Sequence, residues 1–176
     1  MKNCKRKWLK YDDAVWKYKF IDSSAVSSKR HDVKEEQSMR NKEIKIRGFH
    51  LDQFGHVNNI RYPEMLEEAR YDFFDQFPGF FTRVQKIGYY LPITEIHIYY
   101  RKASFLDDIL DIRTRISNLG ERSGTIHQTV TLKGTDRVIL EAEVTFVAVN
   151  VKTGKRAPIE GNLSAEIASV MSGCNK

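Results

Sequence analysis

The chain has 176 residues, of which 41% are hydrophobic and 30% charged, with a formal net charge of +6; this composition is typical of one globular domain with a core. No apolar run approaches the roughly 20 residues that cross a bilayer, and the two cysteines lie near opposite ends without metal-ligand spacing. We therefore expect a cytoplasmic protein with no membrane partner and no disulfide framework.

The positive charge is concentrated at the N-terminus. Residues 1–38 hold 10 basic and 6 acidic side chains, whereas the remainder holds 19 and 17. The remainder lacks the basic stripe that phosphate-backbone binding requires, so we expect no nucleic-acid partner. Residues 1–38 also lack a clean hydrophobic period, and the serine-rich stretch at 23–30 has the composition of a linker. We expect a poorly ordered basic extension that is dispensable for folding, with Met39 as an alternative start.

A regular pattern begins after this extension. Residues 42–49 alternate between apolar and charged side chains and predict a half-buried strand. Apolar side chains then recur every three or four positions from Tyr62 to Phe77, which predicts a helix that begins near residue 60. Asn58 or Asn59 is expected to cap this helix, and Pro78-Gly79 to end it.

Residues 86–150 read as a run of strands separated by turn signals. Each strand has one apolar face: 94–100, 110–116, 126–132 and 140–148. A short helix is expected at 165–170. One strand, one long helix and a run of antiparallel strands predict an α+β domain, with a curved sheet wrapped around a central helix: the hot-dog fold. We place this domain at 39–160, followed by a short C-terminal helix or tail at 161–176.

The loop between the first strand and the helix concentrates polar residues. Asp52, His56, Asn58 and Asn59 lie within eight positions, immediately before the helix N-terminus. A carboxylate or imidazole there can act as a base, and the first helical amides favour negative charge on a carbonyl oxygen. Both are requirements of acyl transfer. The alternative is a structural loop with Asx caps, in which Gly55 supplies a positive φ.

The amino-acid sequence of this loop favours the interpretation as a catalytic site. The segment Asp52-Gln53-Phe54-Gly55-His56-Val57-Asn58-Asn59-Ile60-Arg61-Tyr62, followed by Glu67-Glu68-Ala69-Arg70, resembles the 4-hydroxybenzoyl-CoA thioesterase-like and acyl-ACP thioesterase families. The resemblance extends loosely over residues 41–160. It implies a hot-dog thioesterase acting on an acyl-CoA or related acyl thioester without a cofactor.

The same resemblance assigns roles within the loop. Asp52 would be the general base or the nucleophile, and His56 would orient it or assist proton transfer. Asn58 or Asn59 would position water or cap the helix. Phe54 stands where plant acyl-ACP thioesterases place an asparagine. This departure favours acyl-CoA over acyl-ACP as the substrate.

Two further groups of residues are candidates for chemistry. Glu67 lies at the edge of the apolar helical stripe and is a second candidate carboxylate, although an ion pair with Arg70 is the commoner role for such a residue. His50, Asp52 and His56 have a spacing that can chelate a metal, but the loop motif accounts for Asp52 and His56 without one. We expect no metal.

Two other functions remain open: a hot-dog hydratase or dehydratase for 3-hydroxyacyl thioesters, and a non-catalytic acyl-CoA-binding domain. Val147 and Val149 are expected on the outer face of the last strand, where an apolar patch favours a homodimer or homotetramer. Five aromatic side chains are candidates for an acyl tunnel, although such residues are more often plain core: Phe49, Phe54, Phe73, Phe74 and Tyr89.

Overall fold

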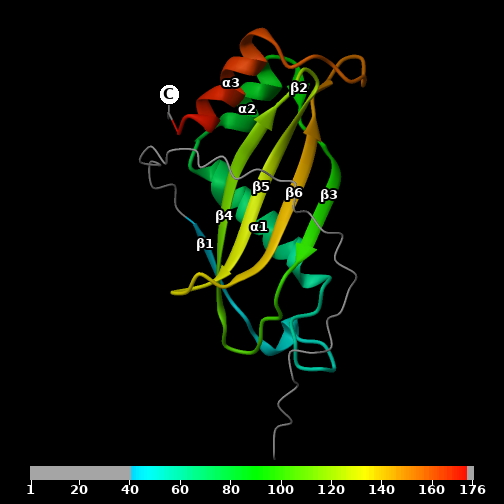
Figure 1. Cartoon of the computed structure of the whole chain (residues 1–176). Coiled ribbons are helices and arrows are strands. Elements are labelled where there is room, and N and C mark those ends of the chain that lie inside the picture. Colours follow the sequence, from blue (N-terminus) through cyan, green and yellow to red (C-terminus); the bar gives the residue numbers. More distant parts are fainter. Residues whose placement is uncertain (1–40, 174–176) are drawn as a thin grey trace, which may run out of the picture. The chain divides into compact units, whose positions relative to one another are not determined.

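The computed structural model describes residues 41–173 and contains two antiparallel sheets and three α-helices in that range (Figure 1). The large sheet has the order β1-β4-β5-β6-β3. In chain order the elements are β1 (Lys42–Lys45), the 3-10 helix η1 (Gly48–His50), α1 (Arg61–Asp75), α2 (Phe80–Lys86), β2 (Tyr89–Tyr90), β3 (Ile93–Tyr100), β4 (Ile109–Leu119), β5 (Ser123–Leu132), β6 (Val138–Val147), β7 (Val149–Asn150) and α3 (Gly161–Met171). The predicted extension at 1–38 and the alternative start at Met39 lie outside the described residues.

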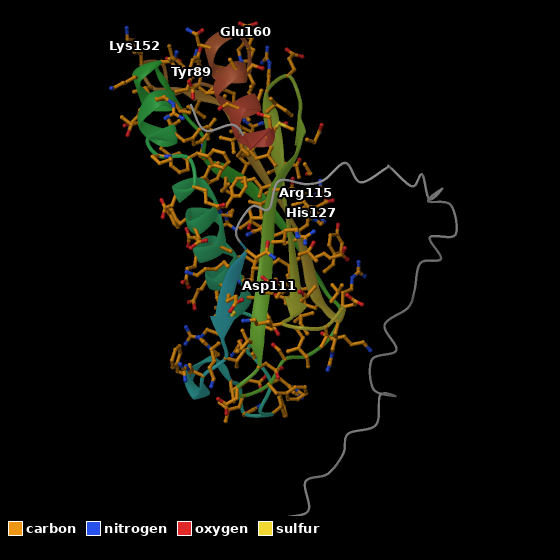
Figure 2. All side chains as sticks on the ribbon, turned by 90° about the vertical axis from the view of Figure 1, so that its left-hand side faces the viewer. Tyr89, Asp111, Arg115, His127, Lys152 and Glu160 are labelled. Carbon is orange, nitrogen blue, oxygen red and sulfur yellow. The ribbon has the colours of Figure 1, made fainter. Side chains whose placement is uncertain are left out.

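The sheet has one apolar and one polar face, as its alternating sequence predicts. Leu110, Ile112 and Val130 point inward and are almost fully buried. α1 crosses this inner face, and Figure 2 shows Arg115 and His127 on the side of the sheet away from the helix. The long central helix and the wrapped antiparallel sheet confirm the predicted α+β arrangement.

The start of the domain differs from expectation in two details. The strand predicted over 42–49 ends at Lys45, because the chain then turns into η1, where the Arg47 amide donates to His50 Nδ1 at 3.0 Å. Neither Asn58 nor Asn59 is the N-cap of α1. That position belongs to Ile60, which has no side-chain cap, while Asn58 Oδ1 accepts the Ile60 amide at 3.1 Å.

The other end of the domain holds one helix that the hydrophobic pattern did not predict, α2, and one that it predicted too short, α3. α1 ends at Asp75, and α2 begins after Gly79, whose φ of 76° lies in the left-handed region at the N-cap of the new helix. α3 is longer than the predicted 165–170, and its Leu163, Ile167 and Val170 are buried in the core. Helices α2 and α3 lie together at the end of the sheet opposite the loop that precedes α1 (Figure 1).

Val147 and Val149 are not on an exposed outer face, so that part of the prediction is wrong. Both are buried, with 4% and 7% of their surface exposed. For Val149 the cause is a change of sheet, because β7 pairs with β2 instead of continuing the large sheet, whereas Val147 is the last residue of β6 and still pairs with Ser123 of β5. Exposed apolar side chains lie instead on the edge strand β3. No helix within residues 41–173 is long and apolar enough to cross a membrane.

Candidate active site

Residues 51–57 form a tight hairpin-like loop ahead of α1. Leu51 and Val57 make an antiparallel bridge, and inside it the Asp52 amide donates to the His56 carbonyl at 2.8 Å. The Gly55 amide donates to the Asp52 carbonyl at 3.1 Å, and Gly55 has a φ of 79°, which glycine adopts without strain. The loop is thus fixed by its own backbone.

The Asp52 carboxylate is held by one of its two oxygens. Oδ1 accepts the amides of Phe54 at 2.8 Å and His56 at 3.3 Å. Oδ2 makes no hydrogen bond to any other residue of the described range 41–173. The side chain is half-buried. One oxygen therefore sets the orientation, while the other is chemically able to act on a water or a carbonyl carbon.

Asn58 fixes the start of α1 relative to this loop. Its amide donates to the His50 carbonyl at 2.9 Å, and its own carbonyl accepts the Arg61 amide at 2.9 Å. Within residues 41–173, the amides of Asn59 and Tyr62 have no hydrogen-bond partner. These two N–H groups lie at the positive end of the helix, where a developing oxyanion is stabilised.

A second anchor lies beneath the helix start. Ser104 is fully buried, and its carbonyl accepts the Val57 amide at 3.0 Å. Its hydroxyl lies 2.7 Å from the hydroxyl of Tyr62, and burial raises the pKa of this tyrosine. The Tyr100 hydroxyl donates to the Asn59 carbonyl at 3.1 Å. The segment after β3 and the end of β3 thereby hold both sides of the turn into α1.

His56 contacts Asp52 through its backbone amide and not through its imidazole. The ring packs edge-on against Phe105, with centroids 5.3 Å apart. His50, the third member of the possible metal set, accepts the Arg47 amide on Nδ1, and burial is the main reason that its pKa is lowered. Among the described residues no three histidine, cysteine or acidic side chains are grouped to hold a metal ion.

Glu67 lies well apart from the loop along α1. It is six residues beyond Arg61, about 9 Å along the axis at about 1.5 Å per residue. Its side chain is exposed and borders a cavity. The ion pair proposed for Glu67 with Arg70 is not formed, because the Arg70 guanidinium turns inward.

Arg70 instead enters a buried polar network that the sequence reading missed. Its Nη1 donates to Gln128 Oε1 at 3.0 Å. Gln128 is fully buried, and its Nε2 donates to the Leu66 carbonyl at 2.9 Å and to Thr114 Oγ1 at 3.0 Å. Burial lowers the pKa of Arg70, with the charge of Glu67 opposing that effect. The available signal was a single glutamine on an otherwise apolar strand face.

The cavity lies between the second half of α1, the helices α2 and α3, and the inner face of the sheet, and has a volume of about 180 Å³. Glu67, Arg70 and Tyr71 line it on the part of α1 nearer the loop. Phe80 of α2 and Ile167 of α3 line it farther from the loop. The cavity is thus polar at one end and apolar at the other.

Of the five residues predicted for an acyl tunnel, one lines this cavity. Phe74 lines it. Phe73 is ordinary core, and Tyr89 packs against the core while half-buried. Phe49 and Phe54 are 70% and 73% exposed near the loop, so neither lines an enclosed tunnel within the chain. An aromatic residue type alone did not identify the cavity wall.

Comparison with known proteins agrees with the fold. The sequence model of the thioesterase-like superfamily matches residues 48–167. The long-chain acyl-CoA thioesterase FadM of Escherichia coli (strain K12) is 36% identical over 130 residues, which cover 73% of this chain and 97% of FadM. The chloroplastic acyl-acyl carrier protein thioesterase ATL2 of Arabidopsis thaliana is 30% identical over 110 residues, or 62% of this chain and 58% of ATL2.

A solved structure extends the comparison to three dimensions. YbaW, a probable thioesterase from Escherichia coli, superposes with a TM-score of 0.69 at 34% identity, over 75% of this chain and 98% of YbaW. Fold and matches together define a thioester hydrolase with the hot-dog fold. The chain belongs to the thioesterase-like superfamily. The predicted fold and the predicted enzyme class are both confirmed.

Proposed function

We propose that this protein hydrolyses acyl-CoA thioesters to the free acid and CoA, with Asp52 as the catalytic carboxylate. The observation that carries the proposal is the Asp52 side chain, held through Oδ1 by two backbone amides beside the start of α1. The name of FadM, a long-chain acyl-CoA thioesterase, supports a fatty acyl-CoA substrate and a role in fatty acid metabolism. The name of ATL2 keeps an acyl carrier protein as the alternative carrier.

Two routes use the same carboxylate. In the first, Asp52 Oδ2 takes a proton from a water, whose oxygen attacks the thioester carbonyl carbon. In the second, Oδ2 itself attacks that carbon and expels the CoA thiolate, and water then opens the resulting mixed anhydride. In both routes the carbonyl oxygen carries a negative charge in the tetrahedral state. The CoA thiolate then leaves and is protonated.

The start of α1 supplies the remaining chemistry. The amides of Asn59 and Tyr62 are the donors available for the oxyanion, because Asn58 already satisfies the amides of Ile60 and Arg61. Asn58 is therefore a positioning residue that fixes these donors. His56 contributes its backbone amide to Asp52, and its imidazole is the one within residues 51–57 that could assist proton transfer. Glu67 is the reserve carboxylate, placed on the cavity wall.

A water-labelling experiment detects the anhydride route by label in Asp52. In a single turnover with excess enzyme in heavy-oxygen water, direct water attack places the label in the free acid. Attack by Asp52 forms the mixed anhydride. When water opens this anhydride at the Asp52 carbonyl, the label appears in Asp52 and the free acid of the first turnover is unlabelled. Mass spectrometry of the acid and of the peptide containing Asp52 reads both results.

One assay tests the function itself. CoA release is followed with a thiol reagent across saturated acyl-CoAs of increasing length and an unsaturated acyl-CoA. We expect stoichiometric release of thiol and acid. A hydratase would change the unsaturated substrate without releasing thiol, and a binding domain would bind acyl-CoA and release nothing. Either result with folded, full-length protein would contradict thioester hydrolysis.

We also propose a cytoplasmic homodimer, or a homotetramer built from two such dimers. β3 is an edge strand with no pairing partner on one side within residues 41–173. It carries exposed apolar side chains at Ile93, Ile96, Tyr99 and Tyr100, between 40% and 49% exposed. An apolar edge of this kind requires cover. Sedimentation at micromolar concentration tests the assembly, and a monomer would contradict it.

A further inference from the structure

The inner face of the sheet contains one glycine that sits directly opposite a phenylalanine. Gly124 of β5 pairs with Phe146 of β6 in the antiparallel register, and both residues are buried. Gly124 continues the inward row of Ile126 and Gln128, so its missing side chain would point toward the helices. A glycine inside a strand often marks a place where another group approaches the backbone closely.

Here the group that approaches is the ring of Phe146. A Cβ atom added to Gly124 would lie 2.2 Å from Phe146 Cζ, 2.6 Å from Cε1 and 2.9 Å from Cε2. An ordinary carbon–carbon contact is about 3.5–4.0 Å. The ring therefore occupies the space that any other residue at position 124 would fill.

The same ring forms part of the cavity wall. Phe146 lines the cavity together with Ile126 of the neighbouring strand β5 and Ile116 of β4. One side of the ring rests on Gly124, and the cavity lies among the side chains that cover the sheet there. A side chain at position 124 would lift the ring off β5 and toward the cavity.

We propose that Gly124 and Phe146 set the depth of the acyl pocket and thus the chain length that this enzyme prefers. The proposal rests on the proposed hydrolysis of acyl-CoA. The occupant is the hydrocarbon part of the acyl group, because the end of the cavity away from the loop is apolar and formed by Phe80, Ile167 and Phe146.

The geometry of α1 indicates a chain of substantial length. Arg70 lies nine residues beyond Arg61, about 14 Å along the helix axis at about 1.5 Å per residue. An extended hydrocarbon chain advances about 1.3 Å per carbon, given C–C bonds of about 1.5 Å. A chain that starts at the helix N-terminus and runs beside α1 thus needs roughly ten carbons to reach the level of Arg70.

Two substitutions are expected to move the preference in opposite directions. Gly124→Ala lifts the Phe146 ring, shortens the pocket and favours shorter acyl chains. Phe146→Leu removes part of the ring, deepens the pocket and favours longer ones. Because one methylene in an apolar pocket changes specificity by about 10-fold or more, the ratio of kcat/KM between long and short acyl-CoAs should fall by about that factor in Gly124→Ala. The ratio should rise similarly in Phe146→Leu.

Matched controls separate the pocket from general damage. Gly48→Ala adds the same methyl group where nothing lies within 4 Å. Phe77→Leu makes the same truncation in the same core cluster, at a residue that does not line the cavity. Both controls should keep the wild-type order of preference. The double variant Gly124→Ala/Phe146→Leu should resemble Phe146→Leu more than Gly124→Ala, because the smaller side chain no longer needs the space above position 124.

The outcomes distinguish this proposal from the function on which it rests. If wild-type protein releases no thiol from any acyl-CoA, the proposed function fails. If wild-type protein is active and both variants fold by thermal melt but keep its chain-length profile, only the role of Gly124 and Phe146 is overturned. Equal shifts in Phe77→Leu would overturn it as well. If Phe146→Leu fails to fold, Gly124→Ala against Gly48→Ala decides the question alone.

Discussion

The loop before α1 and the cavity farther along the same helix are assembled in different ways. Residues 50–61 are held by short-range hydrogen bonds, such as the two amides on Asp52 Oδ1 and the Asn58 contacts at the helix start. The cavity is formed by side chains from all three helices and from strands of the large sheet. One site depends on local backbone geometry, and the other on tertiary packing.

Because of this difference, we expect substitutions in the loop to change mainly the turnover rate and substitutions in the core to change mainly the free energy of unfolding. Asp52 and Asn58 are only half-buried, so we expect substitutions there to remove little packing and to act mainly on the proposed chemistry. Gln128 and Phe146 are almost fully buried, so substitutions there change the free energy of unfolding or the shape of the pocket.

The largest expected effect is on turnover at Asp52. Asp52→Asn keeps the size of the side chain and an oxygen for the amides of Phe54 and His56, but removes the charge. A positioned base contributes about 10²–10⁴-fold in rate, so kcat should fall by at least about 100-fold with little change in Tm. Glu67→Gln, on the cavity wall, is the matched control and should retain most activity. Steady-state kinetics with thermal melts measure both.

The reverse pattern would change the assignment. A folded Asp52→Asn protein with full turnover, together with an inactive Glu67→Gln protein, would transfer the catalytic role to Glu67. Loss of activity in both would indicate two cooperating carboxylates. Neither outcome would alter the hot-dog fold or its thioesterase-like membership.

The next largest effect concerns the network beneath α1. Gln128→Leu leaves Arg70 without its acceptor and Thr114 without its donor inside the core. An unsatisfied buried polar group costs about 1–3 kcal/mol, so the free energy of unfolding should fall by about that amount. Thr129→Val, at the next position on the polar face of β5, is the control and should change it by less than about 0.5 kcal/mol. Urea titrations give both values.

The loop could be predicted from the sequence more fully than the cavity, because the loop is held by local hydrogen bonds and the cavity by residues that are distant in the chain. Asp52, His56, Asn58 and Asn59 lie in one short segment, and their hydrogen bonds join neighbours in the chain, so the loop could be identified from its residues alone. The strand faces were equally accessible, because Leu110, Ile112 and Val130 obey the two-residue period. The proposed chemical roles of the loop residues stay predictions that kinetics must test.

Features that depend on distant partners were not accessible in this way. Arg70 and Gln128 are 58 positions apart, and Gly124 faces Phe146 only once β5 and β6 pair. Val149 was misplaced because the alternation was extended past the point where the chain changes sheet. α2 has only seven residues, too few for a helical period to stand out.

A smaller effect is expected at the turn of the loop. Gly55 has a φ of 79°, and nothing lies within 4 Å of the position where a Cβ would be placed. Gly55→Ala therefore costs backbone strain alone, about 1–2 kcal/mol. Gly55→Asn should cost less, because asparagine tolerates this conformation better. Equal losses in Tm for the two variants would show that strain at φ is not the cause.

The smallest effect is expected on the outer face of the sheet, away from both sites. Burial, followed by the charge of Arg115, lowers the pKa of His127, while Glu141 and Glu143 oppose the shift. Because the pKa in the folded state lies below that in the unfolded chain, the unfolded chain binds the proton more readily. The stability contribution of neutral His127 is therefore complete above the unfolded pKa of about 6.5 and declines as the pH falls toward the folded pKa.

Variants around His127 test the sign of this linkage. Between about pH 7.5 and about pH 5, the range in which histidine titrates, Tm of the wild type should fall more steeply than that of His127→Gln. Comparison of these two removes the parallel contribution of His50, whose pKa is also lowered and which both proteins retain. Arg115→Gln removes a cation that disfavours protonation and should flatten the decline. Glu143→Gln removes an anion that favours protonation and should steepen it. A steeper decline of Tm in Arg115→Gln, together with a flatter one in Glu143→Gln, would mean that His127 is coupled to charges other than these two.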